Sequence, residues 1–200
     1  PAGAGQLPAG RGRMAGTGRH APTCLLLGAA GGGKTLLARR LRHIRRDRGA
    51  GRQPRGTAAP NRSLSRQVGT NLTDLRLPRK VTVRELGGCM GPIWPSYYDE
   101  CSALLFVVDA ANPTQVSSSC VQLLSVLSAA PLASVPVLVL FNKIDLPCYM
   151  SLAEMKSLFR MQDIVSCASQ PITLLEISAR NGTGLADVLQ WLQAALGDQR

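Results

Sequence analysis

A glycine-rich segment, residues 28–35, fits the phosphate-binding pattern G-x-x-x-x-G-K-[ST]. It separates an apolar run, 23–27, that is typical of a buried strand from a segment, 36–46, whose leucines and isoleucine recur at helical spacing. Glycines allow backbone N–H groups to turn toward a phosphate, and the helix N-terminus adds a favourable dipole. We therefore predict a phosphate loop in which the lysine contacts the β- and γ-phosphates and the threonine binds Mg²⁺. Its residues are Gly28, Gly31, Gly32, Gly33, Lys34 and Thr35.

The rest of the chain alternates predicted strands with predicted helices. Apolar or alternating runs indicate strands over 71–77, 80–86, 102–109, 135–141 and 172–177. Helical spacing of apolar residues indicates helices over 113–130, 151–160 and 184–196. The first two of these strands are separated by Pro78 and predict a hairpin. Together the elements predict an α/β fold of three layers, with active groups in loops at the carboxyl ends of the strands.

A second motif, Asn142-Lys143-Ile144-Asp145, directly follows the predicted strand that ends at residue 141. A carboxylate such as Asp145 accepts hydrogen bonds from guanine N1–H and the exocyclic amine, donors that adenine does not offer in that place. Asn142 would contact the guanine edge, and the stem of Lys143 would cover the ring. The pattern is weak alone, but its position after a strand and after a phosphate loop favours a guanine nucleotide.

Charge and composition limit the other classes of function. The chain has a formal net charge of +11, yet 14 of its 23 basic residues and one of its 12 acidic residues precede position 67. We predict a disordered extension over 1–21 and a long basic loop over 47–67, because both are rich in Gly, Pro and Arg. Only two histidines are present, which argues against a multi-histidine metal site. The six cysteines form no C-x-x-C pair, and we predict a reduced, intracellular protein without a membrane span or lipid anchor.

From about residue 23 to residue 196 the sequence resembles the Ras-like small GTPases, and within them the ADP-ribosylation-factor-like branch. The resemblance includes Glu-Leu-Gly-Gly at 85–88, Ser-Ala-Arg at 178–180, and the segments 69–74, 84–94 and 141–150. It implies a Ras-like domain over 22–197 with a six-stranded, mostly parallel sheet and five helices. It also implies GTP or GDP with Mg²⁺ as ligands, Gly88 at the γ-phosphate, and Ser178 and Ala179 at guanine. We expect a cytoplasmic monomer whose two switch regions contact effector and regulatory proteins.

The chain departs from the family pattern in both switches. In the second switch, Glu85 stands where the family has an aspartate that holds the Mg²⁺ shell, and Cys89 stands where a glutamine orients the attacking water. A thiol cannot hold a water as a carboxamide does, so we predict slow hydrolysis. In the first switch, Gln67 takes the place of the Mg²⁺-binding threonine, and Thr70 is interpreted as a polar residue entering a strand.

These departures leave alternatives open. The leading hypothesis is a guanine-nucleotide-dependent regulator, and the alternative is a nucleotide-insensitive scaffold that binds partners through the same fold. A P-loop kinase ranks last because Asn142 and Asp145 would then be coincidental. The arginine run from 39 to 55 is interpreted as a solvated helix face that leads into the loop, and without interleaved aromatic residues it does not predict nucleic-acid binding. Trp94 is compatible with either core packing or partner binding, and Trp191 is predicted to lie in the core.

Overall fold

The computed structural model describes residues 21–47 and 70–197. Its six strands form one sheet in the order β2-β3-β1-β4-β5-β6, in which β2 and β3 are antiparallel and every other pair is parallel. The strands are β1 Thr23–Gly28, β2 Thr70–Arg76, β3 Lys80–Leu86, β4 Cys101–Asp109, β5 Val137–Asn142 and β6 Ile172–Ile177. The mostly parallel six-stranded sheet implied by the resemblance is therefore confirmed.

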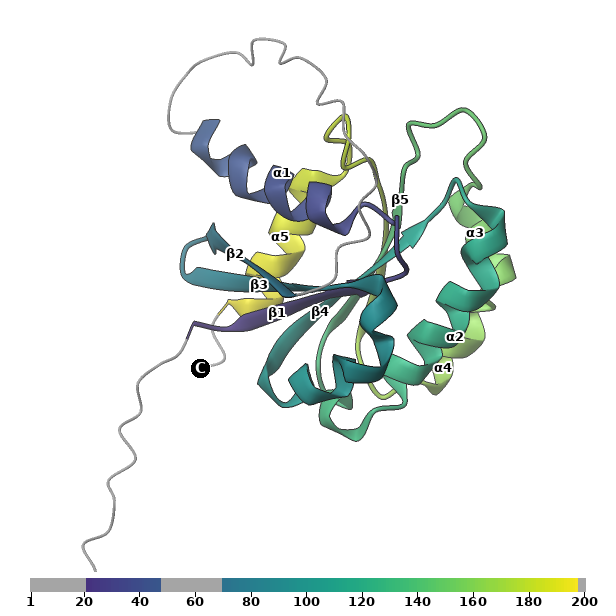
Figure 1. Ribbon diagram of the computed structural model, residues 1–200, viewed down its shortest axis with the longest axis horizontal. Coiled ribbons are helices and arrows are strands. Elements are labelled where there is room, and N and C mark those ends of the chain that lie inside the picture. The colour runs from purple at the N-terminus through teal and green to yellow at the C-terminus, as the bar shows by residue number, and fades with distance from the viewer. Residues whose placement is uncertain (1–20, 48–69, 198–200) are drawn as a thin grey trace, which may run out of the picture.

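Helices cover both faces of this sheet (Figure 1). On one face, α1 and α5 share a hydrophobic cluster with alternate strand residues such as Leu26 and Val83. On the other face, α2, α3, α4 and a 3₁₀ helix, η1, share a second cluster that includes Leu25 and Leu27. The α-helices are α1 Lys34–Asp47, α2 Val116–Leu127, α3 Leu152–Leu158, α4 Met161–Cys167 and α5 Leu185–Leu196. The 3₁₀ segments are η1 Gly88–Glu100, η2 Pro113–Gln115 and η3 Ala130–Leu132. The three predicted layers are present, with alternate strand residues filling the two interfaces.

The helices differ in detail from the sequence expectation. Arg160 adopts a left-handed conformation with φ +50° and separates an unpredicted short helix, α4, from α3, which corresponds to the helix predicted over 151–160. The beginning of α3 is fixed by a capping box between Ser151 and Glu154. No helix was predicted over 88–100, where η1 contains Pro92 and Pro95. Prolines lack the N–H that an α-helix requires, so the segment has weak helical signals in its sequence.

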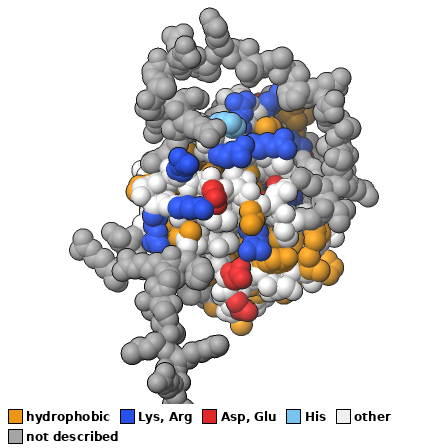
Figure 2. Space-filling model, turned by 60° about the vertical axis from the view of Figure 1, so that its left-hand side comes forward, with side chains coloured by type: hydrophobic (Ala, Val, Ile, Leu, Met, Phe, Trp, Pro, Cys, Tyr) orange, Lys and Arg blue, Asp and Glu red, His pale blue; other side chains and the backbone are white. Residues whose placement is uncertain are grey.

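Parts of the sequence interpretation cannot be compared with the fold. The extension predicted over 1–21, except its last residue, and nearly all of the basic loop over 47–67 lie outside the described residues. Gln67 lies outside them as well. Figure 2 shows Lys and Arg side chains gathered on the face that carries α1 and the β2–β3 hairpin. Arg39 and Arg42 on α1 are exposed, as expected for a solvated helix face.

Two further expectations concern the membrane and the cysteines. Within the described residues, every helix is too short or too polar to span a bilayer. All six cysteines are described, and each is a free thiol.

The aromatic residue that follows the second switch belongs to the core. Trp94 is buried, and its indole Nε1 donates to the backbone oxygen of Gly87 at 3.1 Å. Trp191 packs against the opposite core and donates to Thr173 Oγ1, also at 3.1 Å, but in an exposed position. The two indoles make hydrogen bonds of equal length in environments that differ in burial.

This difference gives a prediction about stability. Trp94→Phe should lower the free energy of unfolding by about 1–3 kcal/mol, because it removes the buried indole hydrogen bond, leaves the Gly87 carbonyl to accept from the Met90 N–H, and creates a small cavity. Trp191→Phe removes the same group at an exposed site and should lower it by less than about 0.5 kcal/mol. Urea unfolding of both variants measures the difference. Equal losses in the two variants would show that the Trp94 hydrogen bond does not stabilise the second switch.

Candidate nucleotide-binding site

The phosphate loop connects the end of β1 to the start of α1. Gly33 has φ +93°, and a Cβ there would lie 2.4 Å from Asn142 Nδ2, so this position requires glycine. Lys34 begins α1 and is 6% exposed, and its Nζ donates to the backbone oxygens of Gly28 at 2.9 Å and Ala29 at 2.8 Å. The predicted loop residues are thus brought together, with the ammonium group held inside the loop.

Burial has a direct effect on the lysine. It lowers the pKa of Lys34 from its ordinary 10.5 to about 8, and the nearby Glu85 and Cys89 offset part of that shift. The ammonium is therefore charged at neutral pH and neutral at more alkaline pH. A phosphate placed against it favours the charged form.

The shifted pKa predicts a pH dependence of nucleotide affinity. Below pH 8 the protonated lysine is available to the phosphates. Above pH 8 the free protein loses that proton, so nucleotide binding must take one up, and GTP affinity should fall by up to about tenfold between pH 7 and pH 9. Titration of GTP at several pH values measures this. A Lys34→Met variant is the control and should show a flat profile, and a parallel fall in both proteins would contradict the assignment.

The metal end of the site lies where α1 meets β3. Thr35 Oγ1 donates to Glu85 Oε1 at 2.5 Å, and Asn71 Nδ2 donates to Glu85 Oε2 at 3.3 Å. Asn71 is the cross-strand partner of Glu85 in the β2–β3 hairpin. Sequence reasoning did not identify Asn71, although its place opposite an acidic residue in a hairpin is a usable signal.

The donor atoms at this end fit Mg²⁺. A hydroxyl and a carboxylate are hard oxygen ligands, and Mg²⁺ is commonly held by one or two protein oxygens together with substrate phosphates and water. Among the residues that the structure describes, no group of three or more His, Cys, Asp or Glu side chains could hold a metal by itself. The site therefore fits an ion that is shared with a phosphate.

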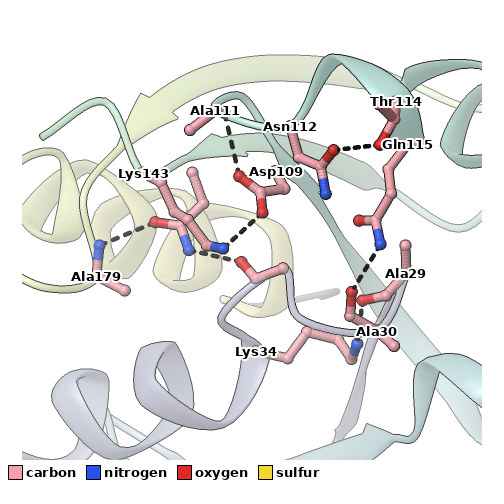
Figure 3. Close-up of polar contacts among 12 residues, drawn as sticks. Ala29, Ala30, Lys34, Asp109, Ala111, Asn112, Thr114, Gln115, Lys143 and Ala179 are labelled. Carbon is pink, nitrogen blue, oxygen red and sulfur yellow. Dashed lines mark hydrogen bonds and ion pairs between the residues drawn. The ribbon is translucent and has the colours of Figure 1, made fainter. Parts of the chain in front are cut away.

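The base end is a cavity of about 200 Å³ at the carboxyl ends of β5 and β6. Asn142 is 2% exposed, its Oδ1 accepts from the backbone N–H of Ala179 at 3.0 Å, and its Nδ2 donates to Gly32 O at 2.7 Å (Figure 3). The amide that was predicted to contact the guanine edge is thus already used by two loops. The lining residues are Gly33, Leu36, Asn142, Lys143, Asp145, Leu146, Ala179 and Arg180.

Two acidic residues organise the rest of the base end. Asp145 Oδ1 accepts from Ser178 Oγ at 2.6 Å, which brings together two predicted guanine-contacting residues. Lys143 has φ +75°, and its Nζ pairs with Asp109 Oδ2 at 2.5 Å (Figure 3). Asp109 is 6% exposed and was missed from the sequence, although an acidic residue at the end of an apolar strand is a recognisable signal. Leu36, which lines the cavity from the first turn of α1, was missed as well.

The second switch contacts the opposite end of the phosphate loop. A Cβ on Gly88 would lie 2.2 Å from the backbone nitrogen of Ala30 and 2.5 Å from the carbonyl carbon of Ala29. Such an approach between two backbones is possible only for glycine. The neighbouring Cys89 is exposed. Gly88 therefore packs directly against the backbone of the phosphate loop at Ala29 and Ala30.

A phosphate loop and a base pocket in this arrangement agree with the sequence comparisons. The sequence profile of the ADP-ribosylation factor family matches residues 13–196. The chain belongs to this family. Membership in the ADP-ribosylation factor family makes it a small GTPase, a GTP-binding regulatory protein.

Individual family members show how far the similarity extends. The chain is 61% identical to human ADP-ribosylation factor-like protein 16 over 182 residues, which cover 91% of this chain and 89% of the relative. It is 32% identical to ADP-ribosylation factor-like protein 3 of Chlamydomonas reinhardtii over 110 residues, 54% of this chain and 60% of the relative. The Arl6 BBS3 small GTPase of Trypanosoma brucei, solved with the bound nucleotide analogue GppNp, superimposes with a TM-score of 0.73. That comparison covers 90% of this chain and 100% of the other at 20% identity, and it shows the shared fold.

Proposed function

We propose that this chain is a guanine-nucleotide-dependent regulator of partner proteins, with residues 22–197 forming one nucleotide-binding domain. It binds GTP or GDP with Mg²⁺, hydrolyses GTP slowly, and contacts effector and regulatory proteins through its switch regions as a cytoplasmic monomer. The observation that carries the proposal is the buried Asn142 amide, which ties the phosphate loop at Gly32 to the guanine loop at Ala179. One side chain thereby fixes the distance between the phosphate and base ends of the site.

Each predicted site residue has a role in this proposal. The ammonium group of Lys34 and the loop N–H groups hold the phosphates, and the Gly88 N–H contacts the γ-phosphate. Asp145 accepts from guanine, Ser178 orients that carboxylate, and Ala179 closes the base pocket. Thr35 and Glu85 are the oxygen donors for Mg²⁺, which when bound supplies positive charge beside the phosphates.

Slow hydrolysis is proposed because Cys89 stands in the place of the water-orienting glutamine. Cys89→Gln should raise the single-turnover rate of GTP hydrolysis by at least about 10-fold, because a carboxamide both donates to and accepts from a water. Measurement of released phosphate at saturating enzyme gives the rate. Cys148→Gln, which adds the same carboxamide at another exposed cysteine, is the matched control and should leave the rate unchanged. If Cys89→Gln leaves the rate of GTP hydrolysis unchanged, Cys89 is not the residue that makes hydrolysis slow.

The nucleotide that the protein retains tests the proposed binding. We would purify the full chain with Mg²⁺, denature it, identify the released nucleotide by chromatography, and titrate GTP against ATP. Recovered GTP is the expected result, because turnover is slow. Recovered GDP would be consistent with a nucleotide-dependent regulator, but it would show that GTP is hydrolysed without the glutamine. GTP affinity no better than ATP affinity would overturn the proposal.

A nucleotide-insensitive scaffold is the second candidate, and one observation favours it. Glu85 and Cys89 stand where the family has an aspartate at the Mg²⁺ shell and a glutamine that orients the attacking water, so the second switch lacks both usual residues. The scaffold predicts equal partner binding with GDP, with a non-hydrolysable GTP analogue and without nucleotide. The regulator predicts a preference for one nucleotide state.

A further inference from the structure

Gln115 reaches the phosphate loop from an element that the proposed binding and hydrolysis do not use. It ends η2 and occupies the N-cap position of α2, yet it makes no side-chain hydrogen bond to that helix. Its Nε2 instead donates to the backbone oxygen of Ala30 at 3.4 Å (Figure 3). Because an N-cap side chain ordinarily accepts from the first turn of its own helix, this carboxamide serves the loop rather than the helix.

The other end of the same carboxamide has no partner among residues 21–47 and 70–197. Gln115 Oε1 is buried and makes no hydrogen bond within the described part of the chain. A buried amide oxygen without a donor costs folding free energy, which an apolar side chain of the same shape would avoid. The contribution that can offset this cost is the hydrogen bond from Nε2 to Ala30.

Ala30 marks one particular end of the loop. Its backbone nitrogen is the atom that a Cβ on Gly88 would approach within 2.2 Å, so the second switch lies against it. The base end is different, since Gly32 and Gly33 there contact Asn142. Gln115 therefore acts at the end of the loop where a γ-phosphate would meet the second switch, away from the guanine pocket.

We propose that Gln115 is a positioning residue for the γ-phosphate. It holds the Ala30 end of the phosphate loop against Gly88, and so sets the preference of this chain for GTP over GDP. The inference rests on the proposed function, because it assumes that the loop binds guanine nucleotides. Cys89 brings no carboxamide to this end of the loop, whereas Gln115 brings one from η2.

The test compares affinities for GDP and for a non-hydrolysable GTP analogue, each with Mg²⁺, in the full chain. Gln115→Met keeps the length of the side chain and removes the amide. Gln115→Asn keeps the amide and withdraws it by one methylene, so that it no longer reaches Ala30. Both variants should lose about 3- to 10-fold in the ratio of GTP-analogue affinity to GDP affinity, the effect of one hydrogen bond. Gln122→Met, on α2 with its own buried and unpartnered Oε1, is the matched control and should keep the parent ratio.

The outcomes separate this inference from the function beneath it. A lowered ratio in the two Gln115 variants but not in the Gln122 variant supports the positioning role. Equal losses of affinity for GDP and for the GTP analogue would overturn it, since a residue that only stabilises the fold would have that effect. An unchanged affinity ratio in either Gln115 variant that keeps the parent melting temperature would overturn it as well. If the parent protein binds neither nucleotide, the proposed function is overturned, and the inference about Gln115 is overturned as well.

Discussion

Replacing Lys34 with methionine is expected to lower the affinity for GTP by about 100-fold or more. Truncation of one partner in a buried, hydrogen-bonded charge pair costs about 2–5 kcal/mol, and the phosphates would lose such a partner. The methionine keeps most of the apolar stem and avoids burying a charge, since Lys34 as a whole is 6% exposed and burial lowers its pKa to about 8. The fold should therefore lose little more than the two hydrogen bonds that Nζ donates to Gly28 and Ala29, while the affinity for GTP falls. Fluorescent-nucleotide titration measures the affinity, and thermal unfolding without nucleotide checks the fold.

A matched control separates the effect of losing a lysine at position 34 from the effect of losing any positive charge. Lys156→Met removes one exposed lysine from α3 and should leave both GTP affinity and stability at the parent values. If the Lys34 variant keeps affinity within threefold of the parent, the loop does not hold phosphate as proposed. The assignment of residues 28–35 would then have to be abandoned.

The second large effect is expected at the contact between the second switch and the loop. Gly88→Ala places a methyl group 2.2 Å from a backbone nitrogen, and the backbones must separate by about 1 Å to admit it. A displacement of that size at a reacting group can cost about 100-fold. We expect the affinity for a non-hydrolysable GTP analogue to fall by about 10- to 100-fold, and the affinity for GDP to fall much less, because GDP has no γ-phosphate at this contact.

Gly91 provides the comparison for this variant. A Cβ at Gly91 would meet no atom within 4 Å, so Gly91→Ala should keep the affinities of the parent. Titration of both variants with both nucleotides gives four constants. A Gly88→Ala variant that binds the GTP analogue as tightly as the parent would show that the second switch does not approach the loop in the GTP state.

Much of the fold could be predicted because buried strands and amphipathic helices leave direct patterns in the sequence. The strands β4 and β5 are continuous apolar runs, and α5 has leucines and valine at helical spacing. The short helix α4, which follows the left-handed Arg160, was not predicted, since a helix of seven residues is too short to show a clear apolar period. The η1 helix also has no periodic apolar face and is fixed by the burial of Trp94 and Tyr98 in the core.

The candidate site was predictable only where a residue belongs to a motif. Lys34 and Asp145 stand in patterns with a known chemical logic, and the structure brings both to the carboxyl ends of the strands. Asp109 and Gln115 act through contacts with residues 34 and 85 positions away, and no local pattern encodes such contacts. The sequence also predicted only part of the role of Asn142, because its two hydrogen-bond partners, Gly32 and Ala179, lie in loops that are distant from it along the chain.

The double use of the Asn142 amide has a kinetic consequence. Because both of its hydrogen bonds are made within the protein and require no ligand atom, the ordering of the two loops belongs to folding and is not repeated at each binding event. Association of a nucleotide should then proceed without a slow ordering step, at a rate set by encounter and orientation. Differences in nucleotide affinity among variants of the site should therefore appear mainly as differences in residence time.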